Sequence, residues 1–431
     1  MDDLLQLSAD IIESGDNDRP FNRITQELTE VADGLAVVES FSHSVLVDTG
    51  DGLVAFDASH EATGAAVVEA ITGWTASPVS HLVYTHGHAD HVGGSVAFDA
   101  AFDDMVVVGH ENVARRFARY RDTNAWNVLI NARQFGGVRG DFTMGDADEP
   151  DFIPKGTMAP NHIVATHDTL VVGDRTIELH HARGETDDHL WGWMPEEKWM
   201  FAGDFVIWNF PNAGNPQKVQ RYPLEWAAAL RDMASRRPEI LLPAHGLPVG
   251  GAERIEEMLT TIAGALEGLV ADVVEMMNAG EVLDTIIHTV GVAPELLAMP
   301  YLRPLYDEPE FVIRNIWRQY GGWWDGAPSR LKPSPDATLA HELAELAGGA
   351  DRLAARATEV LADDTRLACH LVDLAAWAAP DDASVHAIRA EVYAHRRQIE
   401  TSLMAKGIFA GAMRESKAIA DLDSREVANG V

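Results

Sequence analysis

Residues 85–94, which read THGHADHVGG, constrain this chain more than any other feature of its sequence. Three imidazoles and one carboxylate lie within six positions, and zinc in proteins takes these groups as ligands. A metal site explains this density of ligand groups better than a structural role does. The apolar residues 81–84 are typical of a strand, so the ligands are expected in a loop that follows a strand. The four side chains are those of His86, His88, Asp90 and His91.

The spacing of these side chains predicts a site for two metal ions. His86 and His88 are two residues apart and can point to one side of the loop, while Asp90 and His91 turn towards a neighbouring position. Glycines at 87, 93 and 94 let the backbone pass close to the ions. We therefore expect two Zn²⁺ per chain, with a coordination position left open for water as in catalytic sites.

The pattern of apolar residues predicts strands and helices that alternate up to about residue 250. A helix is expected over residues 63–72, and no firm element over residues 125–167, which are rich in Gly, Asp, Pro and Asn, as in an active-site loop or lid. Beyond residue 250, apolar residues at helical spacing predict an all-helical region. The predicted strands are residues 35–38, 44–47, 53–56, 81–85, 105–109, 169–172, 176–180, 190–194, 199–201 and 240–242.

Composition narrows the possible partners and the location of the protein. A formal net charge of -34 should repel nucleic acids and anionic membrane surfaces. The single cysteine, Cys369, excludes an intrachain disulfide and a thiolate zinc cluster. Neither a signal-like N-terminus nor an apolar run of about 18 residues is present, so we expect a cytoplasmic protein that binds no nucleic acid and no membrane.

The motif in residues 85–94 resembles the HxHxDH signature of the metallo-β-lactamase superfamily. The resemblance implies an α/β fold, the αββα sandwich, over a catalytic domain at residues 1–255. It also implies a supporting role for Asp57, a metal-bridging role for Asp204 and a place for His245 as the last histidine ligand. Asp90 and Asp204 are the candidate catalytic carboxylates. The implied metal ligands are His86, His88, Asp90, His91, Glu185, Asp204 and His245.

Glu185 departs from the usual pattern of the superfamily, which has a histidine at this position. A glutamate there is a feature of the alkylsulfatase branch, and zinc accepts a carboxylate oxygen. His189 is the alternative third ligand, and Glu185 would then support the site or face the substrate. If Glu185 is the ligand, His189 is expected to support the site without binding the metal.

The sequence NIWRQYGGWWDGAPS at residues 315–329 resembles the passage that opens the dimerisation domain of alkylsulfatases. Taken alone, such a cluster of aromatics, Gly and Pro could form a structural corner. Together with the metal motif it implies an all-α dimerisation domain at residues 256–431 and a homodimer. The sterol-carrier-like third domain of longer alkylsulfatases is expected to be absent.

The implied chemistry is hydrolysis of a small anionic ester, such as an alkyl sulfate, by a hydroxide held between the two metals. The segment that follows Asp204 contains four candidates for binding the substrate. Two features depart from the alkylsulfatase pattern: no arginine lies where alkylsulfatases bind the sulfate, and Phe135 stands where they have a tyrosine near the leaving group. The candidates are Asn212, Asn215, Lys218 and Arg221.

Other functions remain open at this point. A hydrolase of the same fold could cleave a thioester, a lactone or a phosphodiester, and an iron-dependent oxygen or persulfide enzyme could use the same scaffold. A binding protein without catalysis is disfavoured by the complete ligand set. Histidines outside the motif are expected at the surface or in supporting positions, and Trp208 is a candidate pocket wall. These histidines are His43, His60, His110, His162, His167, His180 and His181.

Overall fold

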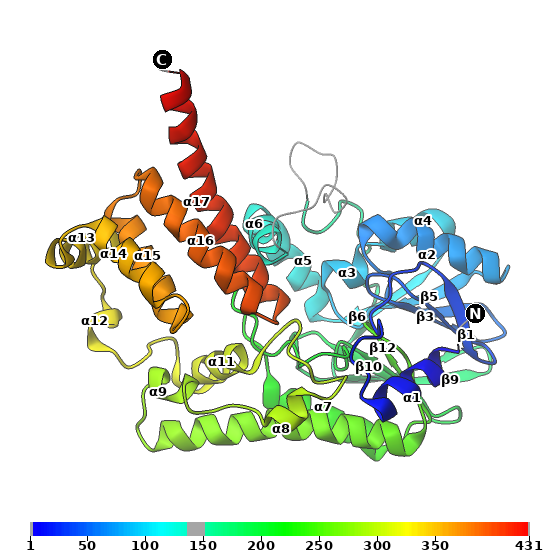
Figure 1. Cartoon of the computed structure of the whole chain (residues 1–431). Coiled ribbons are helices and arrows are strands. Elements are labelled where there is room, and N and C mark those ends of the chain that lie inside the picture. Colours follow the sequence, from blue (N-terminus) through cyan, green and yellow to red (C-terminus); the bar gives the residue numbers. More distant parts are fainter. Residues whose placement is uncertain (1–2, 136–150, 430–431) are drawn as a thin grey trace. The chain divides into compact units, whose positions relative to one another are not determined.

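Two β-sheets lie face to face in the computed structural model, which describes residues 3–135 and 151–429 (Figure 1). Contacts divide the chain into two compact units. The first, which contains both sheets, comprises Met1–Val128 and Met144–Gly322, and the second comprises Leu129–Thr143 and Trp323–Val431.

The first sheet contains seven strands in the order of the sequence. Strands β1 to β4 pair antiparallel, and β4 to β7 pair parallel. Its central strands are buried on both faces and are rich in Val, Leu and Ala, which is typical of strands covered on both sides. The strands are β1 (Leu28–Ala32), β2 (Leu35–Val38), β3 (Ser44–Asp48), β4 (Leu53–Phe56), β5 (Val79–Val83), β6 (Val106–His110) and β7 (His162–Val164).

The second sheet contains six strands in the order β13-β12-β11-β10-β9-β8. All neighbours pair antiparallel except β11 and β12, which are parallel. The strands are β8 (His167–Val172), β9 (Arg175–His181), β10 (Leu190–Met194), β11 (Trp199–Gly203), β12 (Ile240–Pro243) and β13 (Val249–Gly250).

Apolar side chains from both sheets fill the space between them. The rings of Phe56 on β4 and Phe201 on β11 stack with centroids 4.0 Å apart. Burying each such side chain stabilises the fold by about 2 kcal/mol, so this layer is a major source of stability.

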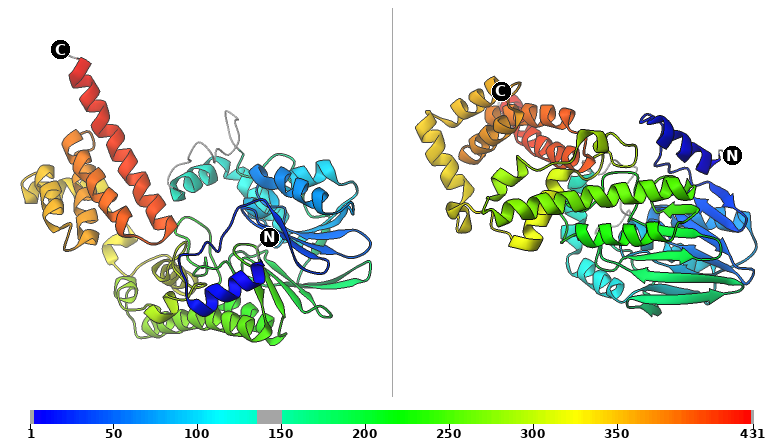
Figure 2. Two further views of the ribbon diagram at one scale, coloured as in Figure 1. Left: turned by 45° about the vertical axis from the view of Figure 1, so that its right-hand side comes forward. Right: turned by 90° about the horizontal axis from the view of Figure 1, so that it is seen from below.

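Helices cover the outer faces of both sheets. Side chains of α2 to α5 pack on the first sheet, and those of α1, α7 and α8 pack beyond the second. The two further views show the long helix α8 (yellow-green) running beside the green part of the chain (Figure 2). The helices are α1 (Leu4–Ser14), α2 (Glu61–Trp74), α3 (Ala89–Val92), α4 (Ser95–Ala101), α5 (Asn112–Asp122), α7 (Pro223–Ser235), α8 (Ala252–Asn278), α9 (Leu283–Ile287), α10 (Pro294–Leu297) and α11 (Pro309–Gly321).

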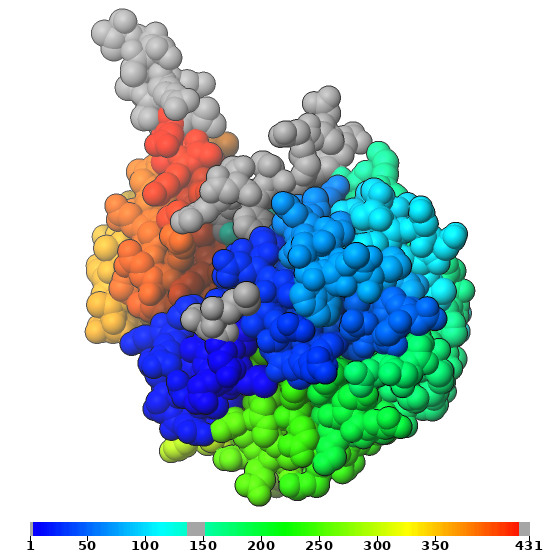
Figure 3. Space-filling model, turned by 90° about the vertical axis from the view of Figure 1, so that its right-hand side faces the viewer, coloured from blue at the N-terminus to red at the C-terminus, as the bar shows by residue number. Residues whose placement is uncertain are grey.

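Helix α1 lies against β13, so the start of the described chain packs on the segment near residue 250. Figure 3 shows this dark-blue segment against the green surface. Its first turn is capped by Asp3, whose carboxylate accepts hydrogen bonds from the backbone N–H groups of Leu5 and Gln6.

In its described residues, the second unit is helical. Its small core consists largely of alanine and valine side chains from α13 to α16. Helix α6 (Asn124–Gln134) runs from the first unit into the second. The remaining helices are α12 (Pro328–Leu331), α13 (Asp336–Ala347), α14 (Ala350–Val360), α15 (Thr365–Ala378), α16 (Ala383–Ile399) and α17 (Leu403–Asn429).

The predicted fold class is confirmed: an αββα sandwich is followed by an all-α region. Helices α8 to α11, which follow residue 250, pack within the first unit. Helix α6 and strand β7 form in the segment for which no element was predicted, and residues 136–150 of that segment lie outside the described residues. Within the described chain, no helix combines the length and apolar character that a membrane crossing requires.

Candidate metal centre

The predicted metal-site residues follow strands of both sheets. The motif of residues 85–94 comes after β5, Asp204 directly follows β11, and His245 lies two residues beyond β12. Because β4 runs parallel to β5 and β11 runs parallel to β12, their carboxyl ends lie at the same edge of each sheet. This topology explains how segments far apart in the sequence meet at one centre.

Helix α3 turns the second half of the motif away from the first half. His88 precedes this one-turn helix, and Asp90 and His91 lie within it. The turn needs glycine at its end, because a Cβ atom at Gly94 would lie 2.0 Å from the carbonyl oxygen of Ala58. The close approach holds the metal loop against the end of β4.

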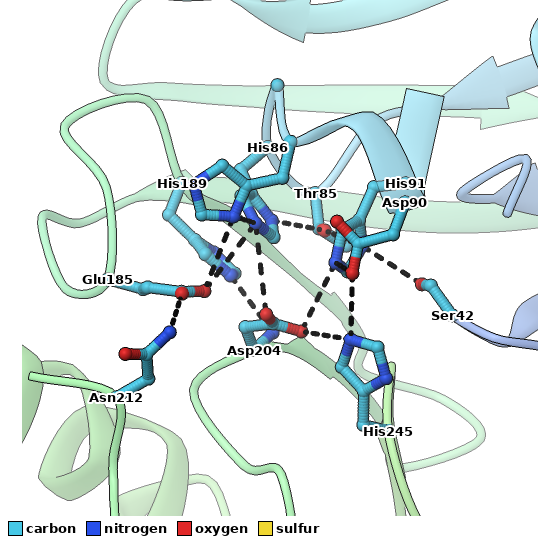
Figure 4. Close-up of polar contacts among 12 residues, drawn as sticks. Ser42, Thr85, His86, Asp90, His91, Glu185, His189, Asp204, Asn212 and His245 are labelled. Carbon is cyan, nitrogen blue, oxygen red and sulfur yellow. Dashed lines mark hydrogen bonds and ion pairs between the residues drawn. The ribbon is translucent and has the colours of Figure 1, made fainter. Parts of the chain in front are cut away.

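One group of donor atoms gathers around His86 and His88. His86 Nε2 lies 2.8 Å from His88 Nδ1, and Glu185 Oε2 lies 3.7 Å from each of these nitrogens. Asp204 Oδ2 is 3.8 Å from His86 Nε2 (Figure 4). Two imidazoles and two carboxylates therefore face one point.

A second group lies on the other side of Asp204. His91 Nε2 and His245 Nε2 are 3.7 and 3.5 Å from Asp90 Oδ2. Asp204 Oδ1 is 3.5 Å from both nitrogens, while its other oxygen faces the first group (Figure 4). Asp204 therefore presents one carboxylate oxygen to each of the two groups.

Three buried atoms that can bind a metal have no hydrogen-bond partner, and this shows that the centre fits metal ions. His91 Nε2, Glu185 Oε2 and Asp204 Oδ1 are buried and have no hydrogen-bond partner. Leaving a buried polar atom unpaired costs about 1–3 kcal/mol, and coordination to a metal would remove that cost. Imidazole and carboxylate ligands suit zinc.

Burial and neighbouring charges set the protonation of the centre. Burial holds the pKa values of His86 and His88 well below the ordinary range, which leaves these imidazoles neutral and able to bind a metal. Burial opposes the ionisation of Asp204, but His91 and His245 outweigh it and hold its pKa well below the usual value. Burial raises the pKa of Glu185, and the Arg221 guanidinium opposes this rise.

The structure gives Glu185 and His189 different positions. Glu185 Oε2 lies with the donors of the first group, whereas His189 Nε2 accepts a hydrogen bond of 3.0 Å from the backbone N–H of Asp204. The His189 ring stacks on His86 with centroids 4.8 Å apart. His189 Nε2 therefore faces the backbone of Asp204 and not the first group of donors.

The Asp57 carboxylate contacts two residues of the motif at residues 85–94, Thr85 and His91. The carboxylate accepts hydrogen bonds of 2.7 Å from the N–H and the hydroxyl of Thr85, and lies 2.8 Å from His91 Nδ1. The Ser42 hydroxyl lies 3.0 Å from the same His91 nitrogen. These contacts leave His91 Nε2 to face the centre, an arrangement common among histidines that bind metals.

A buried ion pair that the sequence did not reveal supports the loop from another side. Arg116 on α5 donates a hydrogen bond of 2.8 Å to Asp188 Oδ2, and this oxygen also accepts one of 3.2 Å from the Gly87 N–H. Arg116 also pairs with Asp187. Asp188 directly precedes His189, a candidate ligand, but no pattern in the sequence indicates that Arg116 is its partner.

Two candidate substrate-binding residues instead contact Glu185. Asn212 donates its side-chain N–H to Glu185 Oε1, and Arg221 Nη1 lies 2.9 Å from the same oxygen. Arg221 also donates to the Glu185 carbonyl oxygen. Asn215 accepts a hydrogen bond from Gln217 N–H, and the Lys218 ammonium lies 5.5 Å from the Phe152 ring centroid.

Three other residues considered in the sequence, Trp208, His43 and Phe135, do not contribute side chains to the two groups of donors. Trp208, a candidate pocket wall, is fully buried in the core and donates a hydrogen bond of 2.8 Å to the Leu247 carbonyl oxygen. His43 is also buried, and its Nε2 lies 2.8 Å from the Gly246 carbonyl oxygen. Phe135 is an exposed residue of the second unit, directly after α6.

Comparisons with known proteins agree with this geometry. Residues 37–245 match the model of the metallo-beta-lactamase superfamily, and residues 282–418 match that of alkyl sulfatase dimerisation. A linear primary-alkylsulfatase of Pseudomonas sp. is 26% identical over 378 residues, covering 83% of this chain and 69% of that protein. An (R)-specific secondary-alkylsulfatase of Pseudomonas sp. is 24% identical over 375 residues, covering 81% of this chain and 56% of that protein.

A solved structure gives the same picture of the fold. A stereoselective inverting sec-alkylsulfatase of Pseudomonas sp. superposes with a TM-score of 0.80 at 21% identity, over 90% of this chain and 65% of that one. The chain thus spans between 56% and 69% of the length of these three relatives. With both family regions matched in order along the sequence, the chain is an alkylsulfatase-like member of the metallo-β-lactamase superfamily.

Proposed function

We propose that this protein is a dizinc hydrolase that cleaves a small anionic ester, with alkyl sulfates as the substrate class. The observation that carries the proposal is the position of Asp204 between two groups of donors, with one oxygen facing each group. The proposed metal ligands are His86, His88, Glu185 and Asp204 for one ion, and Asp90, His91, His245 and Asp204 for the other.

Bound zinc would supply Lewis-acid polarisation and a water whose pKa lies near 7, so that hydroxide is available at neutral pH. The protein residues hold the reacting groups in place. Asn212 and Arg221 fix the Glu185 carboxylate, while Asp57 fixes His91. Fixed ligands reduce the reorganisation that the transition state would otherwise require.

The local charge of the loaded centre favours an anionic substrate despite the acidic chain. Two zinc ions carry four positive charges, and Asp90, Glu185 and Asp204 offset about three of them. Arg221 adds a buried positive charge beside Glu185. An anion near the metals is therefore attracted, although the net charge of the protein is -34.

Lys218 is the cation that we propose for binding the sulfate. Burial and the Arg221 charge lower its pKa to about 8, although Asp90 and Glu185 oppose the change. The ammonium therefore remains mostly protonated at neutral pH. Its charge interacts with those of Asp90 and Glu185, two of the proposed metal ligands, so the ammonium lies close enough to the centre to attract a substrate anion.

The wider organisation of the protein is also a proposal. Residues 1–255 would provide catalysis, and residues 256–431 would form a homodimer, because residues 282–418 match the dimerisation family. Helices α8 to α11 would then link the two functions, since they pack within the first unit. We further propose a cytoplasmic location and no binding to nucleic acids or membranes, given the strongly acidic composition.

A substrate panel tests this function. The purified zinc form is assayed for sulfate release from alkyl sulfates of several lengths, and for hydrolysis of thioesters, lactones and phosphodiesters. We expect sulfate release from at least one alkyl sulfate, lost in His88→Ala. Hydrolysis of only the other esters would reject the sulfatase proposal, and stoichiometric iron in place of zinc would reject the metal assignment.

A further inference from the structure

A second cluster of metal-ligand side chains lies on the sheet of the first unit that carries β8 and β9. His167 belongs to the edge strand β8, and Glu178 and His180 belong to its neighbour β9. One ligand atom from each of the three side chains lies within 4.8 Å of the others. None of the three belongs to the candidate metal centre described above.

The strand register explains why the three side chains meet. His167 pairs directly with His180 across the antiparallel strands. Glu178 precedes His180 by two residues, so both side chains project from the same face of the sheet. Direct cross-strand neighbours on one face have Cβ atoms close enough for their side chains to contact each other.

The distances are close to those required by a single ion. The rings of His167 and His180 have centroids 4.7 Å apart, and His180 Nε2 lies 3.2 Å from Glu178 Oε2. Donors bound to one zinc ion at about 2.1 Å lie about 3.4 Å apart in tetrahedral geometry. His167 is exposed, so rotation of its side chain can close the remaining distance.

Neighbouring residues hold two of the three donors in place. The His180 ring stacks on Trp191 with centroids 4.2 Å apart and an angle of 17°. Arg236 donates a hydrogen bond of 2.9 Å to Glu178 Oε2, and its guanidinium lies 5.0 Å from the Trp191 ring centroid. Metal ligands are commonly oriented by such neighbours. Burial and the Arg236 charge lower the pKa of His180, which favours the neutral imidazole that binds metals.

We infer that His167, Glu178 and His180 form a peripheral site for a divalent transition metal such as Zn²⁺. Two imidazoles and one carboxylate provide three ligands on one side of the ion and leave the remaining positions to water. The ion would join the edge strand β8 to β9. Binding to the native arrangement would therefore stabilise this edge of the sheet.

Metal counting on the full-length protein tests this site. Wild type, His167→Ala and His288→Ala are equilibrated at the same free Zn²⁺ concentration, desalted, and analysed for zinc by mass spectrometry. His288 is the matched control because it is also an exposed histidine with a carboxylate nearby, Asp284 at 3.8 Å. We expect His167→Ala to hold about one zinc ion fewer than wild type and His288→Ala to hold as many as wild type.

Two outcomes would overturn the inference. One is equal zinc content in wild type and His167→Ala, and the other is an equal loss in His288→Ala, which would indicate unspecific binding to surface histidines. Glu178→Gln provides a second variant, and its zinc affinity at this site should fall about 10-fold or more. Hydrolytic activity should be unchanged in all three variants, which separates a failure of this site from a failure of the proposed function.

Discussion

At the scale of single atoms, Glu185 and His189 point in different directions. Both residues lie in one short segment and both could bind zinc, so the sequence left the choice open. In the structure, the Glu185 carboxylate faces His86 and His88, and His189 Nε2 accepts the N–H of Asp204. Spacing alone cannot distinguish them, because each side chain contacts a segment distant in the sequence: Glu185 contacts Arg221, and His189 contacts the backbone of Asp204.

We predict that Glu185→Ala loses about one of the two centre metals and most of the activity, because it removes a ligand. His189→Ala should keep both metals with about 10- to 100-fold weaker affinity, as expected for a supporting residue. Zinc content and sulfate release are measured for both variants. Full metal content in Glu185→Ala, together with one empty site in His189→Ala, would contradict this assignment.

We also predict that Asp188→Asn destabilises the protein by about 3–5 kcal/mol, because it removes the buried carboxylate that pairs with Arg116 and leaves only the partly exposed Asp187. Urea denaturation measures the change in the free energy of unfolding. Asp187→Asn is the control, since Asp187 contacts the same arginine but its side chain is 42% exposed. Equal effects of the two substitutions would show that the buried pair has no special importance.

At the scale of elements, the sequence predicted the strands better than the helices. Short apolar runs bounded by Gly and Asp identified β2, β3 and β4 and the strands β8 to β12. Helix α5 was missed because its sequence, NVARRFARYRD, is strongly polar, and packing buries its Arg116 against Asp188. Helix α7, which follows the candidate substrate-binding residues 212–221, begins at Pro223, and proline is favoured in the first turn of a helix.

The buried carboxylate of Asp307, which has a raised pKa, connects the start of helix α11 to Gly214. Asp307, just before α11, accepts a hydrogen bond of 2.6 Å from the Gly214 N–H. Burial raises the pKa of Asp307 to about 7 in the folded protein. Between about pH 4 and pH 7, the folded protein therefore keeps a proton on Asp307 that the unfolded chain has released. This stabilising contribution is complete below about pH 4 and is lost as the pH rises through about 7.

We therefore predict that Asp307→Asn is more destabilising at about pH 5 than at about pH 8, with a difference on the order of 1 kcal/mol or more. Urea denaturation of wild type and variant at both pH values measures it. Asp272→Asn, at an exposed position of α8, should change the stability equally at both pH values. A pH-independent effect of Asp307→Asn would contradict the raised pKa.

At the scale of the whole molecule, a strongly acidic chain brings the seven proposed ligands of the candidate metal centre together from segments far apart in the sequence. The sequence and its family resemblance named the seven residues that we propose as ligands, and the structure brings their side chains together in two groups. They could not show that Arg221 and Asn212 contact Glu185, because those contacts join segments that pack only in the folded protein. The division into two units also follows from packing, since α8 to α11 lie with the sheets although their composition resembles that of the later helices.

Chelation should lower the melting temperature of the whole protein. Without metals, buried carboxylates and imidazoles lose their ligand bonds, and a ligand that binds only the native state stabilises it by about 4 kcal/mol at 1,000 times its Kd. Differential scanning calorimetry with and without a chelator measures the change. Zinc should restore the original melting temperature, and an unchanged value after verified metal removal would contradict the account.

The most direct test of the central claim relates activity to metal content. The metal-free protein is titrated with zinc, and sulfate release from an alkyl sulfate is measured against zinc bound per chain. A centre shared through Asp204 predicts little activity with about one equivalent and a steep rise as about the second one binds. Full activity with about one equivalent, or no sulfate release at any zinc content, would contradict it.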